Sequence, residues 1–282
     1  IRERGPAYYT LFFAITGIYA QKYGMVGNSL RSIKQNISTP INFFKGITYI
    51  KEPLILDISH KNIMKIEAVR SSALKRGMLI AEDSKWVKFK GKKGGKNIQG
   101  RLRLKGWLGD HWERGDGLLS YKIKLQSDQT ILGMKNFAIQ HPRTRGYMDE
   151  WYFQKLVKNT GLISSRNYYL PIILNGKKYP TYHIEENFEK RLIENNERRE
   201  GPIFKLFERE YVNEERMASR KSVISFYQKD KWSSTDRGNL LLRRAERLMK
   251  GFLSGEYKPE EVFDVELFAR AWALADLVGH HH

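Results

Sequence analysis

The chain of 282 residues contains no cysteine. Disulfide bonds and thiolate metal ligands are therefore excluded, although this says nothing decisive about the cellular compartment. Because 41% of the residues are hydrophobic and 12% are aromatic, a sizeable core is available. The length suits one large domain or two small ones.

Acidic residues are scarce relative to basic ones. The sequence has 31 Asp and Glu against 50 Lys and Arg, which gives a formal net charge of +19. Such a charge predicts an anionic partner: a nucleotide, an acidic membrane surface, an anionic polymer or a nucleic acid. No helix-turn-helix, zinc finger or RNA-binding aromatic motif occurs, so the sequence disfavours nucleic acid.

The common phosphate-binding loops are also missing. Neither the Walker pattern G-x-x-x-x-G-K-[ST] nor the kinase pattern G-x-G-x-x-G is present. The segment Gly91–Gly100, GKKGGKNIQG, resembles a phosphate cradle only superficially, because no helix is predicted after it. We expect a flexible basic hairpin turn there.

Long apolar runs are rare, and the most apolar segment is Pro6–Ala20, PAYYTLFFAITGIYA, which has no charged residue. As a helix it would span about 22 Å, less than the roughly 30 Å hydrocarbon core of a bilayer. Nearby tyrosines could extend its reach at the two interfaces. The segment is interpreted as an uncleaved membrane anchor, and the alternative is a buried helix or strand of a soluble domain.

The most informative stretch is Gly100–Leu125, GRLRLKGWLGDHWERGDGLLSYKIKL. Two alternating strands flank a glycine-rich loop, and each strand has one apolar and one basic face. The basic faces carry the side chains Arg101, Arg103, Lys105, Lys122 and Lys124. Such a face beside a glycine-rich turn is typical of a phosphate-binding site, and the alternative is a solvated hairpin.

Other segments show clear local signals. A strand at 53–59 precedes a helix capped by Ser59 and ended by Gly77, which together predict a small appended α/β element. Asn175-Gly176 predicts a tight hairpin turn. Further elements are predicted as strands at 86–90 and 136–140, a helix from Asp149 to about Gly161, a helix from Ser233 or Ser234 to about Ser254, and a buried last helix at 268–279.

Two motifs resemble one known family. The first consists of R-L-K-G, a short loop and S-Y-K-I-K-L. The second, at Tyr168–Glu185, is a predicted strand, an Asn-Gly turn, a second strand and a terminal Glu. Both are similar to motifs of the CotH-type kinases. These atypical kinases were first met in bacterial spore coats. The resemblance implies an α+β, atypical two-lobed protein-kinase-like fold, here with an N-terminal membrane anchor helix. The expected domains are an anchor at 1–24, a connector with a small α/β element at 25–85, an N-lobe at 86–186 and a helical C-lobe at 187–282, incomplete at its C-terminal end.

The resemblance also implies roles for particular residues. Lys122 or Lys124 would bind the phosphates of ATP with help from Lys105, Glu150 would hold that lysine, and Glu185 would border the nucleotide. For Glu150 and Glu185 the alternative is an exposed structural carboxylate.

Mg²⁺ is implied with ATP, but its ligand is unassigned, because the segment that carries the family's metal-binding Asp does not occur in this sequence. Histidines occupy the expected catalytic position, so Asp276 and His282 are the catalytic candidates. The terminal His triplet is either native or a tag remnant.

The expected function is therefore a membrane-anchored CotH-like kinase that transfers phosphate from ATP to a protein or envelope component. The alternative is a catalytically impaired, pseudokinase-like subunit of a cell-envelope or polysaccharide synthesis or export complex, which acts by binding. Either would be a single-pass protein of the bacterial envelope, with the extracytoplasmic side favoured. Expected partners are the membrane, a protein of an envelope complex, and an anionic polymer or acidic protein substrate.

Overall fold

A computed structural model describes residues 52–107, 109–113, 115, 117–211 and 218–279. The chain divides into the units Ile1–Lys51 and Glu52–His282, and the description that follows concerns the second unit alone.

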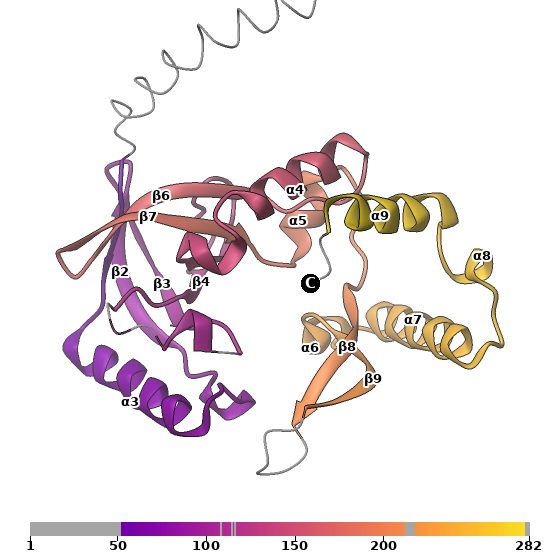
Figure 1. Cartoon of the computed structure of the whole chain (residues 1–282), viewed down its shortest axis with the longest axis horizontal. Helices are drawn as coiled ribbons and strands as arrows, with labels where there is room; N and C mark the ends of the chain where they lie inside the picture. Colours follow the sequence, from indigo (N-terminus) through magenta and orange to yellow (C-terminus); the bar gives the residue numbers. More distant parts are fainter. Residues whose placement is uncertain (1–51, 108, 114, 116, 212–217, 280–282) are drawn as a thin grey trace, which may run out of the picture. The chain divides into compact units, whose positions relative to one another are not determined.

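Seven strands of this unit close into a barrel in the order β1-β2-β3-β4-β5-β7-β6 (Figure 1). Every neighbouring pair is antiparallel except β1 and β6, which run parallel and close the barrel. Closure pairs the backbone groups that an open sheet would leave at its edges. The strands are β1 Leu54–Asp57, β2 Val87–Lys93, β3 Lys96–Leu104, β4 Tyr121–Leu125, β5 Asn136–Gln140, β6 Asn167–Leu174 and β7 Lys177–Glu186.

Alternation along the strands separates an apolar face from a polar one. In β3, Leu102 and Leu104 are buried, whereas Arg101 is exposed; in β4, Ile123 is buried and Lys124 is exposed. Leu102 lies opposite Ile123 in the pairing of these two strands. The buried side chains form one continuous core, so the basic side chains lie on the opposite face of the sheet.

Helix α3, His60–Arg76, packs its buried residues Ile66, Val69 and Ala73 into this core. It ends at Gly77, whose left-handed backbone (φ 79°) lets its N–H donate to the Ala73 carbonyl. The other elements are η1 Ala81–Asp83, η2 Gly109–His111, η3 Pro142–Arg145, α4 Asp149–Asn159, α5 Lys190–Asn195, the hairpin of β8 Phe204–Tyr211 and β9 Ala218–Phe226, α6 Lys229–Ser233, α7 Asp236–Ser254, α8 Pro259–Val262 and α9 Val265–Val278.

The local predictions of strands, helix ends and turns are largely confirmed. The two strands predicted within Gly100–Leu125 pair as β3 and β4, and the helix predicted between Ser59 and Gly77 is α3. Asn175 and Gly176 both adopt positive φ, 47° and 79°, between β6 and β7, as a type I′ turn requires.

The predicted fold class is wrong. The barrel replaces the expected α+β, two-lobed kinase-like arrangement, because β1 pairs with both β2 and β6 and thereby completes a closed sheet. The segment at 53–77 is therefore no appended element. Gly91–Gly100 is also mostly strand, with only Gly94 and Gly95 between β2 and β3.

The single-pass membrane localisation is corrected as well. Within the ranges that the structure describes, no helix has both the length and the apolar character needed to cross a bilayer. The expected anchor Pro6–Ala20 lies outside the described residues.

The last helix, α9, differs from its predicted burial. Leu274 is its buried residue, whereas Trp272 is 57% exposed and Leu277 is 81% exposed. Its contact with α4 is polar at one point, where Arg270 donates to the Thr160 carbonyl over 2.7 Å. A mostly apolar composition does not by itself place a helix in the core.

The close approach of β1 to β2 at Gly91 predicts that a larger residue there would destabilise the barrel. A Cβ atom here would lie 2.1 Å from the Ile55 carbonyl oxygen of β1, so Gly91→Ala must push β1 and β2 apart. We expect the free energy of unfolding to fall by about 1–3 kcal/mol in urea denaturation. Gly201→Ala is the control, because its Cβ would meet no atom within 4 Å. Equal midpoints for the two variants would contradict the prediction.

Candidate functional site

The polar face of the sheet brings basic side chains together with one carboxylate. Arg103 of β3 lies opposite Lys122 of β4, and Lys122 lies opposite Ala138 of β5. Ala138 in turn lies opposite Glu185 of β7. Because residues directly opposite one another share a face, these four residues form one row across four strands. Alanine in this row leaves space between Lys122 and Glu185.

Glu185 is the centre of a hydrogen-bonded network. Its Oε2 accepts from Lys105 Nζ over 2.7 Å and from Gln140 Nε2 over 2.6 Å. The Arg145 guanidinium donates to both carboxylate oxygens over 3.2–3.3 Å. Lys105 also donates to Gln140 Oε1 over 2.7 Å. Two cations therefore share a single carboxylate.

Gln140 and His183 extend this network into the protein interior. Gln140 uses its amide oxygen toward Lys105, so its Nε2 must donate to Glu185 and to His183 Nδ1, which lies 3.1 Å away. Nδ1 is thus the acceptor nitrogen of a neutral ring, and the proton lies on Nε2. His183 is fully buried, and its Nε2 has no hydrogen-bond partner among the described residues.

Arg145 reaches the site because the chain turns sharply after β5. Pro142 begins η3, and the amide of Arg143 donates to the His141 side chain at the N-terminus of that short helix. Gly146 then adopts a left-handed backbone (φ 57°) and leads toward α4. This turn directs Arg145 back over the sheet to Glu185.

His111 of η2 lies near the same charges. Its Nδ1 is 3.0 Å from the Ser120 hydroxyl. Burial lowers the pKa of His111 to about 4, with Lys105 and Arg145 also opposing its protonation and Asp110 favouring it. Burial likewise lowers the pKa of His183 to about 4. Both imidazoles are therefore neutral at pH 7.

The charges fix the ionisation of the central pair. Burial alone would raise the pKa of Glu185, but the cations Lys105 and Arg145 outweigh it and lower that pKa to about 2. Burial lowers the pKa of Lys105, whereas Glu185 raises it. The 2.7 Å contact between the two charged groups is consistent with an ion pair at neutral pH.

Lys122 and Arg103 have no ion-pair partner among the described residues. Burial, together with the neighbouring cations Arg103 and Lys105, lowers the pKa of Lys122 to about 8, and Glu185 offsets this only in part. Arg103 stacks 5.3 Å from the Trp86 ring centroid and donates to the Leu104 carbonyl, but its buried Nε has no partner among the described residues. Positive charge is therefore in excess on this part of the face.

Four of the predicted site residues, Lys105, Lys122, Lys124 and Glu185, lie on the polar face of the sheet. Lys105 and Glu185 are bonded to each other, and Lys122 lies in the same row as Glu185. Lys124 lies one row further along β4 and is exposed.

The other three predicted residues are Glu150, Asp276 and His282. Glu150 accepts from Gln154 within α4 over 2.9 Å, and its charge raises the pKa of Lys105. Asp276 is exposed in the last turn of α9 and makes none of the contacts around Glu185, and His282 lies outside the described residues.

Sequence reasoning missed Gln140, His183 and His111. Alternation could have found His183, because it lies two residues before Glu185 in the same strand and so shares its face. Gln140 is the last residue of β5, and only the pairing of β5 with β7 places it opposite His183. No local signal indicates His111.

Comparisons with known proteins leave the family resemblance a prediction. No protein-family model matches the chain, and no curated protein matches it. Over the described part of the chain, no group of three or more His, Cys, Asp or Glu side chains is arranged to hold a metal ion.

The ion pair predicts the effect of Glu185→Gln. This change leaves Lys105 and Arg145 without their carboxylate, so we expect the free energy of unfolding at pH 7 to fall by about 3–5 kcal/mol. Because the folded-state pKa of about 2 lies below the ordinary value of 4.5, the stabilisation is fully present above pH 4.5. It disappears as the pH falls toward 2, so the difference from wild type should narrow over that range.

Urea denaturation at pH 7 and pH 3 measures this difference. Glu194→Gln is the matched control, because it breaks a solvent-exposed pair with Lys190 and should leave the midpoint nearly unchanged. A Glu185→Gln variant as stable as this control at pH 7 would be inconsistent with the ion pair.

Removing the charge of Lys122 should have the opposite effect and raise the stability of the fold. Its folded-state pKa of about 8 lies below the ordinary 10.5, so the charge destabilises the fold fully below pH 8 and ceases to do so as the pH rises to 10.5. We expect Lys122→Met to raise the melting temperature at pH 7 by about 2–4 °C. The gain should shrink between pH 8 and pH 10.5 in thermal scans. A lower melting temperature at pH 7 would mean that Lys122 is compensated.

Proposed function

We propose that this protein binds an anionic, phosphate-bearing ligand at the cationic face around Glu185. The observation that carries the proposal is the excess of positive charge there: Lys105 and Arg145 already pair with the one carboxylate, and Lys122 and Arg103 lie in the same row of the sheet. A partly buried charge that is not fully compensated lowers the stability of the folded protein, and such destabilising charges are typical of binding sites.

The geometry separates a supporting part from a ligand-facing part. Lys105 is 8% exposed and is held by Glu185 and Gln140, so it positions the network. Lys122 and Arg103 are half-buried and make no ion pair with another described residue. An anion that reaches them from solvent would therefore gain charge-assisted hydrogen bonds in partly desolvated surroundings.

Phosphate is the favoured anionic group because it offers several strong acceptor oxygens to convergent cations. Arg145 adds a fork-shaped guanidinium that suits such oxygens, and its side chain is 29% exposed. ATP and Mg²⁺, which the CotH resemblance implies, remain predictions within this proposal. The proposal shares with the alternative expectation, a pseudokinase-like subunit of an envelope complex, only that the protein acts by binding.

Calorimetry tests the site with inorganic phosphate, pyrophosphate, and ATP with and without Mg²⁺. We expect saturable binding to the wild type and a loss of about tenfold or more in Lys122→Met, which lacks one charge-assisted hydrogen bond. Because Lys122→Met is expected to be more stable than the wild type, weaker binding cannot be attributed to unfolding. Lys178→Met, which removes an exposed charge at the start of β7, is the control.

The pH dependence gives a second readout. Affinity should fall as the pH rises through about 8, because Lys122 then loses its proton. Lys122→Arg should keep its affinity at pH 9, since a guanidinium stays protonated. The proposal is rejected if no probe binds saturably, or if Lys122→Met and Lys178→Met bind equally well.

A further inference from the structure

A second cationic feature lies on the same sheet face, away from the Glu185 network. Lys88 of β2 lies directly opposite Arg101 of β3, and Arg101 lies directly opposite Lys124 of β4. All three side chains are exposed. Adjacent strands are about 4.8 Å apart, so this cation row covers about 10 Å. Like charges placed directly opposite one another destabilise a sheet.

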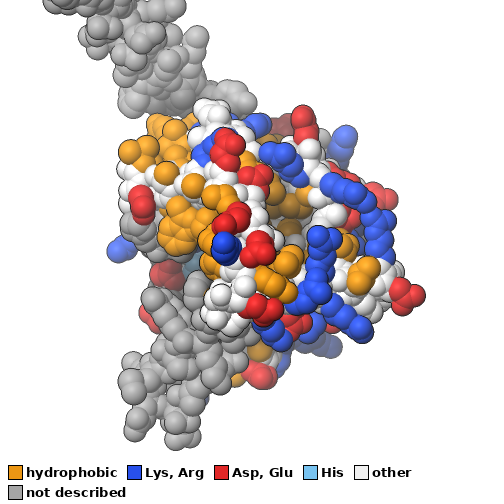
Figure 2. Space-filling model, turned by 90° about the vertical axis from the view of Figure 1, so that its right-hand side faces the viewer, with side chains coloured by type: hydrophobic (Ala, Val, Ile, Leu, Met, Phe, Trp, Pro, Cys, Tyr) orange, Lys and Arg blue, Asp and Glu red, His pale blue; other side chains and the backbone are white. Residues whose placement is uncertain are grey.

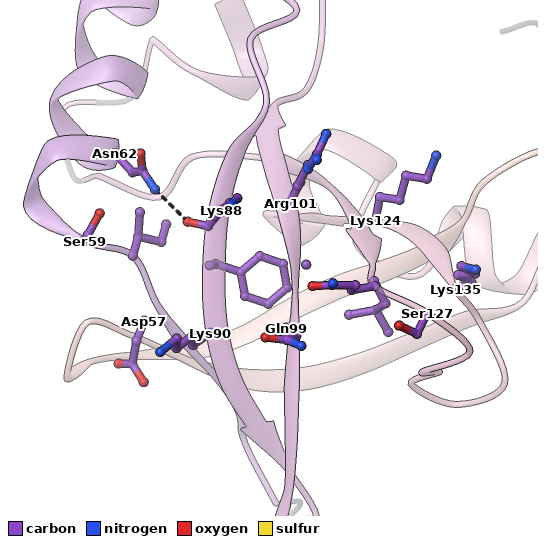
Figure 3. A pocket seen from close by; sticks show the side chains of 15 residues that line it. Asp57, Ser59, Asn62, Lys88, Lys90, Gln99, Arg101, Lys124, Ser127 and Lys135 are labelled. Atoms are coloured by element: carbon purple, nitrogen blue, oxygen red, sulfur yellow. Dashed lines mark hydrogen bonds between the residues drawn. The ribbon is translucent and has the colours of Figure 1, made fainter.

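The row borders a groove of about 1070 Å³, shown in Figure 3. Lys90 and Lys135 line it too, so five cations share the groove with Asp57 as the lining carboxylate. Asp57 lies opposite Lys90 in the pairing of β1 with β2. None of the five cations makes an ion pair with a described residue.

Some surface cations elsewhere in this unit pair with a carboxylate. Lys231 pairs with Glu200 over 2.7 Å, and Lys250 pairs with Glu246 over 2.7 Å. Figure 2 shows one face on which acidic side chains are interspersed among Lys and Arg. The groove differs from these places in that five cations line it together with a single carboxylate.

The N-terminus of α3 adds to the positive potential of the groove. Ser59 and Asn62 line it, and Asn62 donates to the Lys88 carbonyl over 2.9 Å (Figure 3). The first turn of α3 has no acidic residue, and Ser59 makes no side-chain cap. The partial positive charge of this helix end is thus uncompensated by the helix itself.

The lining indicates what kind of anion fits. Single-stranded nucleic acid is usually held by aromatic side chains that stack on its bases, but the lining aromatic residue, Phe89, is only 2% exposed. Four of the five cations are lysines, which act as point charges rather than as phosphate-matching forks. Gln99, Gln126 and Ser127 offer hydrogen bonds that suit peptide amides.

We infer that this groove binds an acidic peptide segment of a partner protein. Three residues of an extended chain cover about 10 Å, so a short run of Asp or Glu matches the cation row in length. Its carboxylates would separate the like charges of Lys88, Arg101 and Lys124. The inference rests on the register and the groove, and it is independent of ligand binding near Glu185.

Fluorescence anisotropy with a labelled octaglutamate peptide tests the inference at physiological salt. The triple variant Lys88→Ala, Arg101→Ala, Lys124→Ala should weaken binding at least tenfold. A matched triple variant, Arg243→Ala, Arg244→Ala, Arg247→Ala, removes the same charge from exposed positions of α7 and should change affinity less than twofold. Lys122→Met should also retain the peptide, which separates the groove from the phosphate-binding proposal.

Three outcomes would overturn the inference. The first is equal loss in the two triple variants, which would indicate attraction to the net charge alone. The second is the absence of saturable peptide binding by the wild type. The third is tighter binding of an oligothymidylate of equal charge, which would identify nucleic acid as the occupant. Melting curves of both triple variants establish that they are folded.

Discussion

The Glu185 carboxylate is the interaction on which the site depends. It is bonded to Lys105, Arg145 and Gln140, and it is the acceptor that allows two cations to lie close together on a partly buried sheet face. Burying an unpaired charge costs several kcal/mol, so the cations could not remain there without a compensating anion. Glu185 offsets the charge of Lys122 only in part, and Arg103 makes no ion pair with another described residue, so positive charge stays in excess on this face.

The barrel supplies the precision that this arrangement needs. Lys105 and Glu185 are 80 positions apart in the sequence, and they meet because β4 and β5 lie between β3 and β7. Side chains on paired strands are held more firmly than those on loops. The same register that forms the Glu185 network also aligns Lys88, Arg101 and Lys124. One sheet face thus carries both the Glu185 network, in which cations pair with a carboxylate, and the cation row of Lys88, Arg101 and Lys124, which makes no ion pair with a described residue.

The sequence predicted what depends on near neighbours. The alternation of β3 and β4, the Asn175-Gly176 turn and the Gly77 helix end are each determined by residues within a few positions. Closure of the barrel depends on pairing between β1 and β6, which no local pattern indicates. The kinase-like expectation made Glu150 the partner of Lys122 or Lys124 and placed Glu185 beside the nucleotide, and it did not indicate that Glu185 bonds Lys105. Periodicity showed which residues share a face but not which strands are neighbours.

Until a ligand binds, Lys122 is crowded by other cations and only partly compensated by Glu185. NMR titration of its side-chain Cε and Nζ resonances measures this directly, with Lys122→Arg used to assign the signals. We expect a Lys122 pKa of about 8 in the free protein and a higher pKa with saturating pyrophosphate. A pKa near the ordinary 10.5 in the free protein, or one that does not change with any phosphate-bearing ligand, would contradict this expectation.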